Sequence, residues 1–157
     1  MKESSTSLRF RIIAFVLTFS VIAFAFIHSS MPSEVSGEES ESVMGIMQYI
    51  LNFFGYTGEL TDHFVRKLAH FTEYTAIGAL LVCCAYSFDR IKPHKYYGQI
   101  LFFGIATAVC DETIQLNVPG RAGMVTDVLL DFAGVITGAL FMLLVCVIYR
   151  RTRKIMY

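Results

Sequence analysis

The chain has 157 residues, enough for one domain, and 55% of them are hydrophobic, a larger share than soluble domains usually carry. Thirteen Lys and Arg balance thirteen Asp and Glu, and the resulting net charge of zero gives no electrostatic reason to expect a nucleic-acid partner. The composition therefore excludes an ordinary soluble domain and indicates a membrane protein.

Four apolar runs are long enough to cross about 30 Å of hydrocarbon. They predict an all-α membrane protein, a single domain over residues 1–157 built as a four-transmembrane-helix bundle, with spans at about 10–28, 67–88, 96–116 and 127–149. The third span depends on its polar end being tolerated, because its apolar part stops at Val109. The first run contains an Ala-x-Ala tripeptide at 23–25 but continues to Ile27, which favours an uncleaved anchor over a cleaved signal peptide.

The segment between the first and second spans has two parts. The stretch "SSMPSEVSGEESES" is acidic and rich in turn residues, which predicts a solvated loop. The stretch "VMGIMQYILNFFGY" has apolar residues at helical spacing and predicts an amphipathic helix, which would lie on the outer leaflet or pack over the bundle. Gly55 and Gly58 end this helix, and Thr61 is a suitable N-cap for the second span.

Basic residues set the direction of the spans. Ten of the thirteen Lys and Arg precede the first span, separate the second from the third, or follow the fourth. The positive-inside rule makes that side cytoplasmic, so we expect a multi-pass protein with both termini inside. The cysteines lie in apolar runs without zinc or redox spacing, and we expect reduced thiols at Cys83, Cys84, Cys110 and Cys146.

Polar residues recur at helical spacing in the last three spans, all at their extracytoplasmic ends, with small residues such as Gly134 and Gly138 deeper in the membrane. The loop between the third and fourth spans is short and turns at Pro119–Gly120, which keeps its Arg close to the helix ends. We therefore expect one outward-opening pocket formed by Arg66, His70, Glu73, Asp111, Glu112, Gln115, Arg121, Asp127 and Asp131. His63 and Lys67 are interpreted as surface groups at the lipid headgroups.

These polar residues could instead form an interhelical network that only fixes packing. Polar pairs between transmembrane helices contribute about 0.6 kcal/mol each on average. Nine polar groups are more than helix packing would need, given the small stabilisation that each pair contributes. Intramembrane ionisable groups also usually mark a pathway or a site. A functional pocket is the better interpretation.

The same residues resemble two motifs of the VanZ-like membrane protein family. The motifs are "RKLAHFTEY" and "DETIQLNVPGRAGMVTDVLLDFAGVITG", and the similarity covers residues 62–144, the motif-bearing core. The matching positions are Arg66, His70, Glu73 and Tyr74 in the first motif and Asp111, Glu112, Gln115, Arg121, Asp127 and Gly134 in the second. Asp131 departs from the family pattern, which has Asn there, and this adds a negative charge.

The resemblance implies an integral protein of a bacterial cell membrane. It also implies an association with resistance to teicoplanin, a glycopeptide antibiotic that acts on lipid-linked cell-wall precursors. It does not imply a particular reaction, because one fold and motif can serve several chemistries. The expected partners are a membrane lipid or a lipid-linked envelope precursor, with the glycopeptide itself as an open alternative.

Two functions fit such a pocket, and the sequence does not separate them. An enzyme acting on an envelope amphiphile would use His70 as general acid or base, with Glu73, Glu112 and Asp127 as further catalytic candidates. A non-catalytic protein would bind a headgroup, peptide or antibiotic in the same place. In both, the binding candidates are Arg66, Arg121, Gln115, Asp111, Asp131 and Tyr74, and the two Arg suit phosphate or carboxylate.

A third function, proton-coupled transport, is less favoured because the inner halves of the last three spans are nearly free of ionisable groups. No cofactor is expected, although one His and several carboxylates could ligate a divalent metal. Against a metal, His70-x-x-Glu73 reverses the Glu-x-x-His order of di-iron bundles. We expect His70 within hydrogen-bonding reach of Glu112 or Asp127, directly or through one water.

Overall fold

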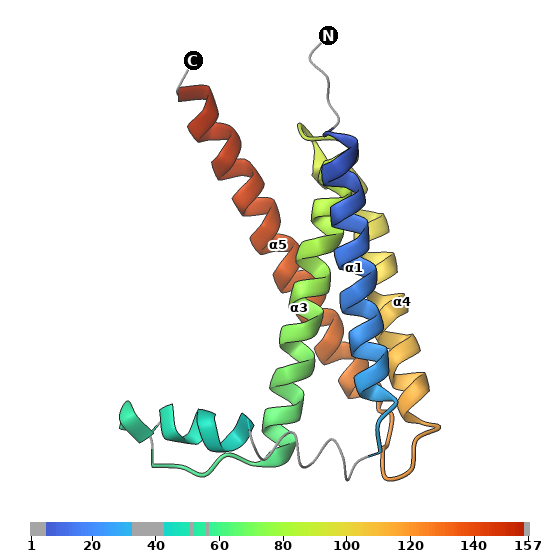
Figure 1. Ribbon diagram of the computed structural model, residues 1–157, viewed down its shortest axis with the longest axis vertical. Helices are drawn as coiled ribbons and strands as arrows, with labels where there is room; N and C mark the ends of the chain where they lie inside the picture. Colours follow the sequence, from blue (N-terminus) through green and yellow to red (C-terminus); the bar gives the residue numbers. More distant parts are fainter. Residues whose placement is uncertain (1–5, 33–42, 51, 56, 156–157) are drawn as a thin grey trace.

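The computed structural model describes residues 6–32, 43–50, 52–55 and 57–155, and within those ranges it contains helices and no β-strand. Its long helices run side by side, and both chain termini lie at the same end of the bundle (Figure 1). This confirms the predicted all-helical fold. The named elements are α1 (Leu8–Ser29), α3 (Asp62–Phe88), the short 3₁₀ helix η1 (Pro93–Tyr96), α4 (Tyr97–Gln115) and α5 (Val125–Ile155).

Three of these helices are long and apolar enough to cross a membrane, namely α1, α3 and α5 up to Thr152. They correspond to the first, second and fourth predicted spans. Helix α4 occupies the third predicted span but is less apolar, because it carries Gln99 near its start and Asp111 and Glu112 near its end. A fourth membrane crossing by α4 therefore stays a prediction.

A helical segment over residues 43–50 precedes α3 and runs sideways from the end of the bundle opposite the termini (Figure 1). Its large apolar side chains are exposed, among them Ile46 at 65% and Tyr49 at 76%. Residues 43–50 are helical. An amphipathic helix that lies on the outer leaflet or packs over the bundle stays a prediction. The acidic loop expected before it falls largely on residues 33–42, which lie outside the described residues.

Side-chain hydroxyls cap the N-termini of α1 and α3. The hydroxyl of Ser7 accepts a hydrogen bond from the Phe10 N–H at 3.3 Å, and that of Thr61 accepts one from the Phe64 N–H at 3.2 Å. These hydroxyls satisfy N–H groups that have no partner within the helix. The predicted N-cap at Thr61 is confirmed.

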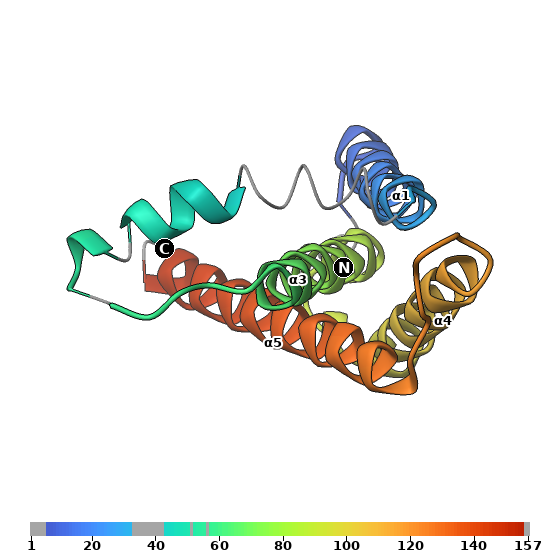
Figure 2. The ribbon, with the colours of Figure 1, turned by 90° about the horizontal axis from the view of Figure 1, so that it is seen from below.

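Small residues allow α3 and α5 to cross in close contact. A Cβ atom on Gly134 would lie 2.7 Å from the carbonyl oxygen of Phe71, and one on Gly138 would meet the carbonyl oxygen of Thr75. Helix α3 lies between α1 and α5, with α4 alongside (Figure 2). Next to this crossing, Tyr74, Ile77, Ala108 and Val135 form a buried apolar cluster. The close approach brings the polar ends of α3, α4 and α5 together.

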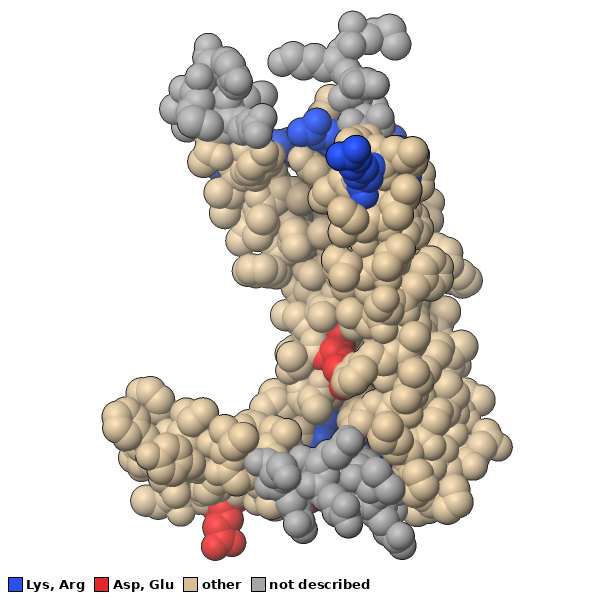
Figure 3. Space-filling view, in the orientation of Figure 1, with Lys and Arg blue, Asp and Glu red and all other residues tan. Residues whose placement is uncertain are grey.

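The charged side chains follow the long axis of the bundle. Lys and Arg gather at the end where the termini lie, and on the same face the surface beneath them is uncharged down to an acidic group near the middle of the bundle (Figure 3). Large apolar residues such as Ile13, Phe19 and Leu144 are more than half exposed on the helix surfaces. An apolar surface of this extent suits contact with lipid.

Candidate functional site

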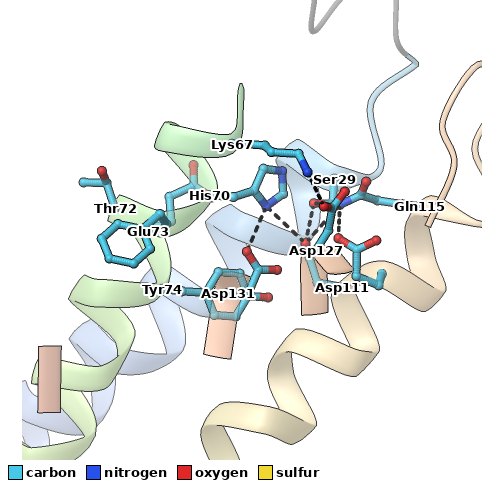
Figure 4. Close-up of polar contacts among 12 residues, drawn as sticks. Ser29, Lys67, His70, Thr72, Glu73, Tyr74, Asp111, Gln115, Asp127 and Asp131 are labelled. Carbon is cyan, nitrogen blue, oxygen red and sulfur yellow. Dashed lines mark hydrogen bonds and ion pairs between the residues drawn. The ribbon is translucent and has the colours of Figure 1, made fainter. Parts of the chain in front are cut away.

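The polar ends of α3, α4 and α5 meet near the end of the bundle opposite the termini. Figure 4 shows their labelled side chains turned toward one another. Each helix contributes residues spaced one turn apart, which places them on one face of that helix. On α3, Lys67 lies one turn before His70, and on α5, Asp127 lies one turn before Asp131. The site therefore has an outer layer and a layer one helical turn deeper.

The deeper layer is centred on His70. Its Nδ1 atom lies 3.7 Å from Oδ2 of Asp111 and 3.8 Å from Oδ1 of Asp131. Both aspartates have no exposed surface, whereas 12% of the His70 side chain is exposed. These distances exceed that of a hydrogen bond, so the three groups face one another across a short gap. Among the described residues, they are the group of three that could hold a metal ion.

The partners of His70 differ from those that the sequence suggested. We expected Glu112 or Asp127 within reach, directly or through one water. The described ion pairs of His70 are with Asp111 and Asp131, so direct contact goes to these two, and reach through a water stays a prediction. The layers explain the difference for Asp127, because it lies one turn further out than Asp131. Glu112 follows Asp111 directly and therefore points about 100° away around α4.

Asp111 is held by a buried hydrogen-bond network. The Ser29 hydroxyl donates to Asp111 Oδ2 at 2.8 Å, and the Gln115 amide donates to the same oxygen at 3.3 Å. The amide also donates to Glu112 Oε1 at 3.2 Å, and Glu112 Oε2 accepts the backbone N–H of Met124 at 2.9 Å. This network joins the end of α1 to α4 and to the loop before α5.

Cationic side chains form the outer layer, with partners that the sequence did not predict. Lys67 Nζ lies 2.8 Å from Asp127 Oδ1, and Arg66 pairs with Asp62 of its own helix at 2.8 Å. Arg121 donates to two backbone carbonyls at the end of α1, those of His28 at 3.3 Å and Met31 at 3.4 Å. The described ion pairs and hydrogen bonds therefore give Arg66 and Arg121 partners outside the second motif.

The turn at Pro119–Gly120 positions Arg121. The Arg121 N–H donates to the carbonyl of Val118 at 3.1 Å, and Gly120 has a φ of 74°, as the third residue of a type II turn requires. Burial, and after it the positive charge of Arg66, lowers the pKa of the Arg121 guanidinium. Arginine remains protonated under any ordinary condition, so the turn holds a second cation close to Arg66.

A pocket of about 230 Å³ opens between these layers. Six predicted site residues line it, namely Arg66, His70, Gln115, Arg121, Asp127 and Asp131, together with His63, Lys67, Gly120, Ala122, Met124 and Leu130. His63 and Lys67 had been assigned to the surface, and Lys67 in particular belongs to the pocket. The cations of such a lining can bind an anionic group, and its carboxylates can exchange protons with that group.

Four predicted site residues lie outside the pocket lining: Glu73, Tyr74, Asp111 and Glu112. Glu73 Oε1 lies 3.7 Å from Nδ1 of His28 on α1. Tyr74 has no exposed surface and donates its hydroxyl hydrogen to the carbonyl of Thr107 at 3.3 Å. This geometry makes Tyr74 a packing residue between α3 and α4 and gives Glu73 a partner other than His70.

Two residues of α1 were missed by the sequence reasoning. Ser29 is fully buried against Asp111, and the ring centroid of His28 lies 6.3 Å from that of His70. Helix α1 has no polar stripe, so periodicity does not single it out. The signal was the run "HSS" at residues 28–30, at the same end of the bundle as the other polar groups.

A family model described as VanZ/LLP1 matches residues 14–147, which includes all of α3, η1 and α4 and most of α1 and α5. No curated protein and no solved structure matches the chain. The match covers well over half of the chain and contains every predicted site residue. The chain therefore belongs to the VanZ/LLP1 family.

Proposed function

We propose that the protein binds the anionic headgroup of an envelope amphiphile in the polar pocket. The pocket would face the extracytoplasmic side of a bacterial cell membrane, with both chain termini in the cytoplasm. Ten of the thirteen Lys and Arg fall in the three segments at the terminus end of the bundle, which supports this direction under the positive-inside rule. The amphiphile would be a membrane lipid or a lipid-linked envelope precursor.

The observation that carries the proposal is the cationic part of the pocket lining, formed by Arg66, Lys67 and Arg121. Guanidinium groups match phosphate and carboxylate oxygens with two parallel N–H donors, so a pair of them favours an anion. The helices that carry the pocket expose apolar side chains along their length. A ligand with a charged head and an apolar tail would meet matching surfaces at both ends.

The size of the pocket favours a headgroup over a whole glycopeptide. Sites that enclose drug-sized ligands usually measure about 300–1,000 Å³. This pocket, at about 230 Å³, is smaller and would accept a phosphate or diphosphate. Under this proposal, a link to teicoplanin would run through the lipid-linked target of the antibiotic.

The test is binding of a short-chain prenyl diphosphate to the purified protein in nanodiscs of zwitterionic lipid, with the prenyl alcohol of equal length for comparison. Arg66→Gln and Arg121→Gln should each weaken diphosphate binding by roughly 10–100-fold, because each removes a charge-assisted hydrogen bond. Lys95→Gln, which removes an exposed cation at the terminus end, is the matched control. Equal affinity for the diphosphate and the alcohol would contradict the proposal.

Catalysis on the same amphiphile is a second candidate, favoured by the position of His70. It lines the pocket, and its Nδ1 faces two buried carboxylates that would orient the imidazole. The test compares the lipid-linked precursor pool in strains carrying His70→Ala or Glu112→Ala. A product missing from the His70→Ala strain supports catalysis, whereas an unchanged pool with lost protection supports binding alone.

A further inference from the structure

Asp131 is a buried carboxylate without a hydrogen-bond partner in the part of the chain that the structure describes. It has no exposed surface, and neither of its side-chain oxygens accepts a hydrogen bond. Oδ1 of Asp111 and Nδ1 of His70 are also buried and lack hydrogen bonds. Removing an ionised carboxylate from water is costly unless it is paired or coordinates a metal.

The nearby cations have their described ion pairs and hydrogen bonds with groups other than the two deep aspartates. Lys67 is paired with Asp127 in the outer layer, and Arg66 is paired with Asp62. Arg121 donates to the carbonyls at the end of α1. None of these three cations has a described ion pair with Asp111 or Asp131, so the two deep aspartates face His70 instead.

The geometry points to a divalent cation site formed by His70, Asp111 and Asp131, one ligand from each of α3, α4 and α5. Each residue offers one ligand atom, and these atoms lie within 4.8 Å of one another. Two ligands that each lie about 2.0–2.2 Å from a tetrahedral ion are roughly 3.5 Å apart. The 3.7 and 3.8 Å separations at His70 Nδ1 are close to that value, and small rotamer shifts would complete the set.

Contacts outside the three ligands agree with this assignment. Ser29 and Gln115 both donate to Oδ2 of Asp111, the oxygen that lies 3.7 Å from His70 Nδ1, and these bonds fix the orientation of the carboxylate. Oδ1 of the same carboxylate has no hydrogen bond. Outer hydrogen bonds of this kind orient the ligands in metal sites. They come from α1 and from the next turn of α4, so the Asp111 ligand would already be oriented before the ion binds.

The donor set indicates the class of ion. Imidazole suits Zn²⁺ and Fe²⁺, and carboxylates also suit Mn²⁺, so we expect Zn²⁺ or Mn²⁺. His70 and Asp131 line the pocket, so the open coordination positions would face an anionic headgroup there. The ion would be coordinated by Nδ1 of His70, the imidazole nitrogen that faces the carboxylates. That nitrogen could not then act as a general acid or base. The inference goes beyond headgroup binding, and either can fail without the other.

The experiment is calorimetric titration of Zn²⁺ and Mn²⁺ into the full-length protein in detergent after treatment with a chelator. We expect about one equivalent bound by the wild type. Asp131→Asn, which keeps the side-chain size, and His70→Gln should abolish it, and Ser29→Ala should weaken it about tenfold. Asp127→Asn removes a carboxylate from the same pocket outside the ligand set and should retain binding within a factor of about three.

A second measurement uses the wild type alone, so it tests the site even if the variants fail to fold. Zn²⁺ should slow the modification of His70 by diethyl pyrocarbonate, read by peptide mass spectrometry, and leave exposed His94 at the terminus end unaffected. Absence of binding by the wild type, or equal binding by Asp131→Asn, would overturn the site. Modification of both histidines at unchanged rates would overturn it as well.

Discussion

Single side chains at the site end of the bundle are held by hydrogen bonds across elements as much as by ion pairs. Glu112 is an example, because one oxygen accepts the Gln115 amide at 3.2 Å and the other accepts the Met124 N–H at 2.9 Å. Only 5% of Glu112 is exposed, so water cannot readily replace these bonds. In this geometry Glu112 anchors the loop that carries Arg121.

We therefore expect Glu112→Ala to lower the free energy of unfolding by about 1–3 kcal/mol, because it leaves buried donors without an acceptor. Thermal or chemical unfolding in detergent, followed by circular dichroism, measures the change. Glu59→Ala removes a carboxylate from an exposed position and should stay within about 0.5 kcal/mol of the wild type. If both variants behave alike, Glu112 does not anchor the loop.

The pair formed by Lys67 and Asp127 gives a second prediction for single residues. Its atoms are 2.8 Å apart, and 33% and 25% of the two side chains are exposed, so solvent screens part of the attraction. A double-mutant cycle with Lys67→Met and Asp127→Asn should give a coupling energy of roughly 1 kcal/mol. Additive effects of the two substitutions would show that the pair contributes nothing to stability.

At the scale of helices, the crossing of α3 and α5 depends on glycines that face backbone atoms. A methyl group at Gly138 would meet the carbonyl oxygen of Thr75, and backbone atoms cannot yield by changing rotamer. We expect Gly138→Ala to force the helices apart and to destabilise the protein by about 1–3 kcal/mol. Gly98→Ala on α4 meets no atom within 4 Å and should be neutral or slightly stabilising. A neutral Gly138→Ala in the same unfolding assay would contradict the close crossing.

The sequence alone predicts most of these elements and part of the site. Periodicity identifies the polar face of each helix, and local chemistry identifies the Thr61 cap and the turn at Gly120. It does not identify which residue on one helix meets which residue on another, because that depends on the axial position of one helix relative to the other. The contact of His70 with Asp131, and that of Ser29 on α1 with Asp111, follow from this relative position of the helices.

For the whole molecule, the positive-inside rule predicts which end faces the cytoplasm. We expect a membrane-impermeant maleimide to label Thr57→Cys in intact cells and to label His94→Cys only after permeabilisation, in a background without native cysteines. Both positions are exposed, and they lie at opposite ends of the bundle. The native thiols are unpaired in the structure, so their replacement breaks no disulfide. Labelling of His94→Cys in intact cells would reverse the topology.

Asp131, Gly134 and Gly138 occupy one face of α5, so the Asp131 carboxylate and the glycines of the close helix contact point in the same direction from the helix axis. One residue inserted between Asp131 and Gly134 would turn the carboxylate by about 100° relative to the glycines and shift it by about 1.5 Å. The glycine contacts would hold the rest of α5 in place, and Asp131 would leave the gap beside His70. On its exposed face, this stretch of α5 can therefore accept an exchanged side chain much more readily than a change in length.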